Sequence, residues 1–120
     1  MSAQRQYPAK IDRIVDGDTM DLTIDLGFGI SKSVRIRLAY VNTDEIFGVS
    51  HYSDEYHKGM KQMMFVNQLL PIGADVTFIS HEETGKYGRP IGDIEVNGQL
   101  LSESILEQFK YLDQDYGSNW

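Results

Sequence analysis

Hydrophobic and polar residues alternate along two segments in the first third of the chain. The apolar positions are Met20, Leu22, Ile24 and Leu26 in the first segment, and Val34, Ile36, Leu38 and Tyr40 in the second. A period of two places these side chains on one face, as in a half-buried β-strand. With the apolar stretch 10–15, they predict three consecutive antiparallel strands, joined by tight turns at 16–19 and 27–29.

The rest of the chain combines helical and strand patterns. A helix is predicted over 54–70, because Ser53 is a good N-cap residue and Pro71 ends the apolar periodicity. Its stripe of methionines is expected to pack into the core. Short apolar runs at 76–79 and 91–96 predict a fourth and a fifth strand, followed by a turn at Asn97 and Gly98 and a second amphipathic helix over 101–112.

Five short strands with a helix between the third and the fourth predict an α+β, mainly β fold. This order is typical of a five-stranded Greek-key barrel of the oligonucleotide-binding (OB-fold) kind, here with about two helices. The chain has 120 residues, of which 41% are hydrophobic. We therefore expect a single domain over 1–120, with its core in about 8–113, that can be stable as a monomer.

Composition excludes several classes of protein. There is no cysteine, which rules out a disulfide framework, a thiolate metal site and a thiol nucleophile. The first ten residues lack an apolar signal region and no stretch is long enough to span a membrane, so we expect a cytoplasmic protein without a membrane partner. The net charge of -7 disfavours tight, non-specific binding of nucleic acid. Local cationic clusters can override it, because charges act over about 8 Å at physiological salt.

Three short motifs hold most of the candidate chemistry. They are Asp16-Gly17-Asp18-Thr19 in the first hairpin, the run from Arg37 to Glu45 that leaves the third strand, and Lys86-Tyr87-Gly88-Arg89 between the fourth and fifth strands. Taken singly, they are a turn, a solvent-facing strand arginine and a polar loop. Taken together and in this order, they resemble the staphylococcal nuclease (thermonuclease) family over roughly residues 10–112.

The resemblance implies a metal-dependent phosphodiesterase of the staphylococcal nuclease type. Such an enzyme hydrolyses DNA or RNA, as an endonuclease or exonuclease, with Ca²⁺ as the expected cofactor and Mn²⁺ or Mg²⁺ as alternatives. We expect single-stranded or frayed substrate, because the phosphate has to enter a pocket beside a base-contacting tyrosine.

The metal site implied by the resemblance contains one substitution. Asp18 matches the family's directly metal-bound aspartate with Asp16 as its neighbour, and Thr43 matches the residue whose backbone carbonyl binds the metal. The family's second metal-binding aspartate is Asn42 here. An amide keeps the carbonyl oxygen but loses a negative charge, so we expect weaker cation binding. Asp44, where the family usually has proline, is a possible source of compensating charge.

The remaining matched residues concern the substrate. Arg37 and Arg89 match the two arginines that hold the phosphate, and Glu45 matches the proposed general base. Lys86 and Tyr87 match the pair that contacts a terminal phosphate and its nucleotide. The chemistry needs such groups, because water attack on a phosphodiester builds negative charge on an already anionic centre. Arginine suits this task, since its planar guanidinium binds phosphate in a bidentate manner and stays charged.

A catalytically impaired barrel that binds nucleic acid or protein is the main alternative. The acidic total charge and Asn42 favour it, and an aromatic lining would be its signature, with Tyr40, Tyr87 and Tyr111 as candidates. Retention of both arginines and of Glu45 favours the enzyme, because a binding module has no need for this set.

Other functions have less support. The three histidines, His51, His57 and His81, could form a transition-metal site, but they lack zinc-ligand spacing and suit surface positions better. A Ser-His-Asp triad lacks a nucleophile-elbow context. An acidic, phosphate-mimicking interaction protein is suggested only by the net charge, which is more often a property of a solvated surface.

Overall fold

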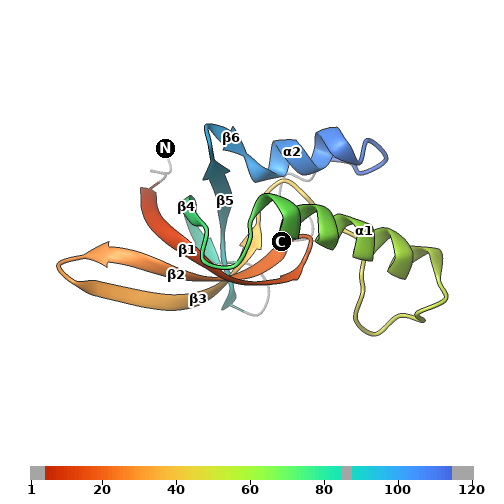
Figure 1. Cartoon of the computed structure of the whole chain (residues 1–120), viewed down its shortest axis with the longest axis horizontal. Coiled ribbons are helices and arrows are strands. Elements are labelled where there is room, and N and C mark those ends of the chain that lie inside the picture. Colours follow the sequence, from red (N-terminus) through yellow and green to blue (C-terminus); the bar gives the residue numbers. More distant parts are fainter. Residues whose placement is uncertain (1–4, 85–87, 115–120) are drawn as a thin grey trace.

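The computed structural model describes residues 5–84 and 88–114. Within these residues the chain forms the following elements (Figure 1): β1 Arg5–Asp16, β2 Thr19–Gly27, β3 Ile30–Leu38, α1 Asp54–Leu69, β4 Asp75–Thr84, β5 Pro90–Val96, β6 Gln99–Leu100 and α2 Leu101–Gln108. Neither of the two helices in the described part of the chain combines the length and the apolar character needed to cross a membrane.

Strands β1 to β5 form a closed, mixed barrel. Neighbouring strands in the order β3-β2-β1-β4-β5 are antiparallel, and a short parallel pairing of β3 with β5 closes the barrel. The closing pair consists of Arg37 opposite Ile91 and Leu38 opposite Gly92. The predicted five-stranded, OB-like barrel with two helices is therefore confirmed. Strand β6, which the sequence pattern did not predict, adds a two-residue hairpin partner to β5.

Strand β1 is longer than predicted, because it begins at Arg5 rather than at residue 10. Its first half pairs with β4, from Arg5 opposite Ser80 to Lys10 opposite Asp75, and its second half pairs with β2. Pro8 lies within the strand. A proline argues against a strand in the sequence, because it cannot donate a ladder hydrogen bond, so the first half of β1 was not predicted. The second half contains two register shifts, so β1 bends from one part of the barrel to the other.

The β2–β3 hairpin extends beyond the barrel (Figure 1). Its tip is the predicted turn, in which Gly27, Phe28 and Gly29 all have positive φ angles and the Phe28 side chain is fully exposed. Strand β3 ends at Leu38, two residues earlier than predicted. The reason is Tyr40, whose φ of 68° lies in the left-handed region that no strand continues through.

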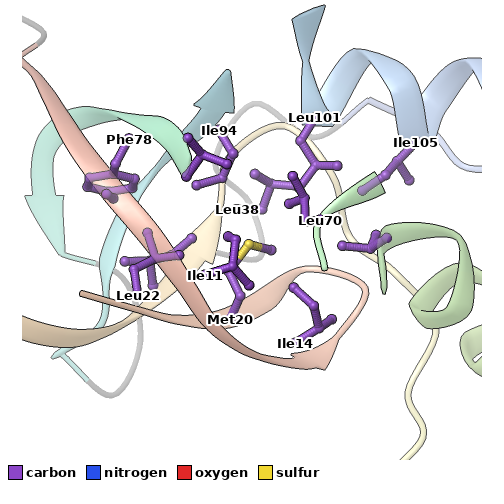
Figure 2. Close-up of a cluster of buried hydrophobic side chains, with 14 of the residues drawn as sticks. Ile11, Ile14, Met20, Leu22, Leu38, Leu70, Phe78, Ile94, Leu101 and Ile105 are labelled. Atoms are coloured by element: carbon purple, nitrogen blue, oxygen red, sulfur yellow. The ribbon is translucent and has the colours of Figure 1, made fainter. Parts of the chain in front are cut away.

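Side chains from all five barrel strands and both helices meet in one hydrophobic core (Figure 2). The alternation in β2 is confirmed for Met20, Leu22 and Ile24, which are buried, but not for Leu26, which is 45% exposed near the hairpin tip. Figure 2 shows Met20 beside Ile11 and Ile14 of β1. The apolar face of β2 therefore packs against the neighbouring strand.

Helix α1 begins as predicted, with the Ser53 hydroxyl accepting the Tyr56 N–H at 3.2 Å. The expected methionine stripe is wrong in part, since Met64 is 56% exposed. The fully buried positions of the helix are Gly59, Gln62 and Val66. A glycine on this face lets the helix approach Asp44 and Ile46 closely, because a Cβ atom on Gly59 would lie 2.6 Å from both.

Helix α2 is shorter than predicted, ending at Gln108, and a neighbouring strand caps it. Its N-cap residue, Leu100, has no side-chain capping bond. Buried Asp93 of β5 instead accepts the Ser102 N–H at 3.2 Å, the Ile94 N–H at 2.9 Å and a hydrogen bond from the Ser102 hydroxyl. A carboxylate at this end also complements the helix dipole. Burial raises the pKa of Asp93 above its usual value, although these hydrogen bonds oppose the shift.

Asp93→Ala is expected to lower the free energy of unfolding by about 2–3 kcal/mol, because it leaves buried donors without an acceptor. Asp93→Asn should cost less, since an amide can accept from both backbone N–H groups and donate to the Ser102 hydroxyl. Urea denaturation of both variants measures the difference. Equal losses in the two variants would contradict this assignment.

The same residue predicts a dependence of stability on pH. A carboxyl whose folded-state pKa is raised stabilises the fold while it is protonated, and this contribution is lost as the pH rises through the folded-state pKa. The parent protein should therefore lose stability relative to Asp93→Asn as the pH rises from about 4, near the unfolded pKa. Parallel profiles for the two proteins would show that Asp93 does not contribute.

Candidate active site

Barrel closure brings the three sequence motifs to one place. Asp18 immediately precedes β2, whose first residue, Thr19, lies opposite Arg37 of β3. Arg37 in turn lies opposite Ile91 of β5, two residues after Arg89. The site is thus built from the beginning of β2, the end of β3 with the loop after it, and the approach to β5.

Asp18 is buried, with an exposed fraction of only 7%, and both carboxylate oxygens accept hydrogen bonds. One oxygen accepts the Thr43 N–H at 2.9 Å and the other accepts the Thr19 hydroxyl at 3.1 Å. Gly17 allows this contact, because a Cβ atom at that position would lie 2.7 Å from Cγ2 of Thr43. The motif is therefore more than a turn, since its glycine provides the space that Thr43 needs beside Asp18.

Arg37 is almost completely buried, at 3% exposure, so it is not a solvent-facing strand arginine. Its Nη1 donates to the carbonyls of Leu38 and Val41, and its Nη2 donates to Oδ1 of Asn42 at 3.2 Å. The same Nη2 lies 3.5 Å from a carboxylate oxygen of Asp18. These contacts hold the guanidinium in one orientation before any ligand arrives, which is the arrangement that electrostatic catalysis requires.

Arg89 is connected to Asp18 through a hydroxyl. Nη1 of Arg89 donates to the Thr19 hydroxyl at 3.2 Å, and that hydroxyl donates to Asp18 at 3.1 Å. A hydroxyl has one proton to give and lone pairs to receive, so the two bonds are compatible. Thr19 was not identified individually from the sequence, although it completes the first motif.

The carboxyl groups of Asp16, Asp18 and Glu45 lie close enough to interact electrostatically. Asp16 accepts the backbone N–H of Asp18 at 3.0 Å. Burial, together with the negative charges of Asp18 and, to a smaller extent, Glu45, raises the pKa of Asp16 to about 7. Glu45 itself is exposed on the loop that follows Thr43. The site therefore concentrates negative charge at one point, which favours a nearby cation.

The expected metal ligands are all oxygen donors. They comprise the Asp18 carboxylate, the Asn42 amide and the Thr43 main-chain carbonyl, and this type of donor suits a hard cation such as Ca²⁺. Within the described ranges, 5–84 and 88–114, no group of three or more His, Cys, Asp or Glu side chains is arranged to hold a metal. The expected set includes an amide oxygen and a main-chain oxygen, which do not belong to those side-chain types. It therefore stays a prediction.

The loop that carries Glu45 is anchored to α1. Gln62 is fully buried, where it accepts the Asp44 N–H at 2.8 Å and donates to the Asp44 carboxylate at 2.7 Å and to the Tyr111 hydroxyl at 3.0 Å. A Cβ atom on Gly59 would lie 2.6 Å from the Asp44 carbonyl oxygen. The Asp44 carboxylate is thus engaged by the helix, and its neighbour Glu45 is held in position.

The sequence pattern did not indicate the roles of Gln62 and Gly59. Both lie on the same helical face as Val66, since Gly59 and Gln62 are three residues apart and Gln62 and Val66 are four apart. Gln62 is therefore a polar residue in an otherwise apolar buried stripe. Such an interruption is a signal for a buried hydrogen-bonding role, because an unpaired amide in the core would cost free energy.

The other predicted residues are distributed as follows. Lys86 and Tyr87 lie outside the described residues. The ring of Tyr40 meets His81 edge-on at 5.3 Å. Tyr111 lies under the ammonium group of Lys58 at 5.2 Å.

Of the two remaining histidines, His51 lies on the segment that leads into α1 and His57 lies within α1. The rings of His51 and His57 both contact Tyr56, at centroid distances of 4.5 and 5.8 Å. They are exposed, whereas His81 is half-buried beside Tyr40. The three histidines thus belong to two separate aromatic contacts.

Comparison with known proteins gives one distant relationship. No protein-family model matches the sequence. The chain is similar to Protein ParB of Escherichia coli, with 27% identity over 100 residues that cover 83% of this chain and 48% of that protein. The chain thus spans about half the length of the curated protein that it matches. Similarity of this extent leaves the chemistry of the site to be argued from its own residues.

Proposed function

We propose that this protein is a metal-dependent nuclease that hydrolyses phosphodiester bonds in DNA or RNA, of the type that its motifs resemble. The observation that carries the proposal is the meeting of buried Asp18, buried Arg37 and Arg89 at the point where β3 and β5 close the barrel. Two arginines beside a carboxylate suit the binding of a phosphate and a cation together. A purely structural ion pair needs only one arginine.

In the proposed reaction, Arg37 and Arg89 bind the non-bridging oxygens of the phosphate. Glu45 accepts a proton from water as the water oxygen bonds to phosphorus, and the leaving oxygen takes a proton from solvent as its bond to phosphorus breaks. Both arginines hydrogen-bond more strongly as charge accumulates in the transition state, so they lower the barrier. A cation held by Asp18, Asn42 and the Thr43 carbonyl would supply further charge neutralisation to the phosphate.

A nucleic-acid-binding barrel without catalysis is the second candidate, and one contact favours it. Oδ1 of Asn42 accepts a hydrogen bond from Arg37 at 3.2 Å, so the only side-chain oxygen of that residue is already engaged. An amide in this position contributes less than a carboxylate to cation binding, because calcium affinity depends on the number of charged ligands.

The test is cleavage of labelled single-stranded and duplex DNA and RNA by the purified protein at low salt. Cleavage is expected with Ca²⁺, Mn²⁺ or Mg²⁺ and should disappear with a chelator. Asn42→Asp is expected to lower the Ca²⁺ concentration for half-maximal activity by roughly tenfold, about 1.4 kcal/mol of binding free energy.

The outcomes separate the two candidates. Cleavage by the parent protein that depends on the cation supports the enzyme. A silent parent with an active Asn42→Asp variant would identify a nuclease that this amide disables. Binding of the oligonucleotides with no cleavage by either protein would favour the binding module.

A further inference from the structure

A groove of about 560 Å³ begins at Gly88 and Arg89 of the third motif and extends along β3 to Lys32. It runs between the edge of β3 and the residues that lead into β5. The residues that line it are Lys32, Val34, Arg35, Gly88, Arg89 and Pro90. In the described part of the chain, β3 pairs with β5 only at Arg37 and Leu38, so the preceding part of this strand has a strand partner only in β2.

The groove is cationic although the protein is acidic. Lys32, Arg35 and Arg89 line it, while the whole chain has a net charge of -7. Asp21 neutralises Arg35 through two hydrogen bonds, at 2.7 and 3.1 Å. Lys32 has no acidic partner within the described residues. Lys32 and Arg89 each contribute a positive charge to the lining of the groove, which complements a polyanion.

Lys32 is too far from the site to share a phosphate with Arg37. Five residues separate them along β3, which corresponds to roughly 16 Å at about 3.3 Å per residue. A lysine side chain cannot cover that distance. If one strand of nucleic acid has a phosphate at Arg37 and Arg89, Lys32 can reach only a different phosphate of that strand.

We propose that this groove binds the backbone of single-stranded nucleic acid next to the bond that is cleaved, with Lys32 as its phosphate contact. The inference rests on the proposed function, because the groove would bind the part of the same nucleic-acid substrate that lies next to the reacting phosphate. The groove has a β-strand edge on one side and a short segment before β5 on the other, and its lining combines the cationic side chains with Val34 and Pro90 but contains no aromatic side chain. A single strand is the expected occupant, held by its phosphates and without preference for sequence.

The experiment measures binding without cleavage. A Glu45→Gln protein is titrated into a fluorescent single-stranded DNA of about twelve nucleotides at several salt concentrations, with and without Lys32→Ala. Removing one phosphate contact should weaken binding roughly threefold to tenfold at low salt and should reduce the salt-dependence slope by about 0.7. Lys61→Ala, which removes the same charge from the exposed side of α1, is the matched control and should leave the slope unchanged.

A dinucleotide with a single phosphate provides the second arm. The loss caused by Lys32→Ala should be larger for the oligonucleotide than for the dinucleotide used as a competitor. Equal losses of affinity for the oligonucleotide and the dinucleotide would overturn the proposal that the groove binds nucleic acid. Equal effects of Lys32→Ala and Lys61→Ala would also overturn it. Because binding is measured without cleavage, the two proposals can fail separately. An inactive parent whose binding depends on Lys32 would contradict the proposed nuclease activity and support the groove as a binding site. An active parent whose binding does not depend on Lys32 would support the activity and contradict the groove.

Discussion

Replacement of Glu45 by glutamine is expected to lower the rate of phosphodiester cleavage by about 10²–10⁴-fold, the usual contribution of a positioned general base. The amide has nearly the same shape but cannot accept a proton from water. The variant should fold normally, because the Glu45 side chain is exposed and its loop is anchored through Asp44 and Gln62. Single-turnover cleavage of a labelled oligonucleotide measures the effect.

Glu107→Gln is the matched control for this change. It removes the same charge from an exposed position on α2, away from the motifs, and should leave the rate and the unfolding temperature unchanged. A Glu45→Gln protein as active as the parent would remove Glu45 from the mechanism. Phosphate binding by Arg37 and Arg89 would then act without Glu45 as a general base.

Arg89→Ala is expected to lower the cleavage rate by about 10²–10³-fold, which corresponds to roughly 2.7–4 kcal/mol of transition-state stabilisation. The loss should appear mainly in kcat, because the arginine binds the phosphate more strongly as charge builds up. Arg89→Lys should recover only part of the rate, since lysine keeps the charge without the planar, bidentate geometry.

Arg89 is a better test than Arg37 because Arg37 is almost completely buried, whereas Arg89 is half-buried. Buried Arg37 donates to the carbonyls of Leu38 and Val41, so its removal would leave buried main-chain oxygens without these donors. The unfolding temperature of Arg89→Ala should stay close to that of the parent, and Arg13→Ala on β1 controls for the lost charge. An unchanged kcat in Arg89→Ala would contradict its role at the phosphate.

The sequence predicts the barrel well where local patterns agree with burial. Strand β2 shows this agreement, because its alternate residues enter the core and its turns contain glycine. The pattern is less informative where one strand serves two partners, as in β1, whose proline and register shifts conceal a long strand. The α1 helix was predicted from its cap, but its buried face was not, since Gly59 and Gln62 there do not resemble core residues.

The candidate site was predicted as a set of residues and not as an arrangement. Motif order identified Asp18, Arg37 and Arg89, which the closed barrel brings together. The burial of Arg37 and the space that Gly17 leaves for Thr43 depend on contacts between segments far apart in the chain. A single sequence contains no local signal for such contacts, and the same limit applies to the capping of α2 by Asp93.

The parallel pairing of β3 with β5 has a consequence for the order of events during folding. It is only two residue pairs long, it includes Arg37, and it joins segments that are distant in sequence. Loop-closure entropy opposes such a contact, so it is expected to form after the local β2–β3 hairpin. A nascent chain that has not yet exposed β5 on the ribosome holds Asp18 and Arg37 but not Arg89. Under the proposed function, nucleolytic activity is therefore expected to begin only when the barrel closes.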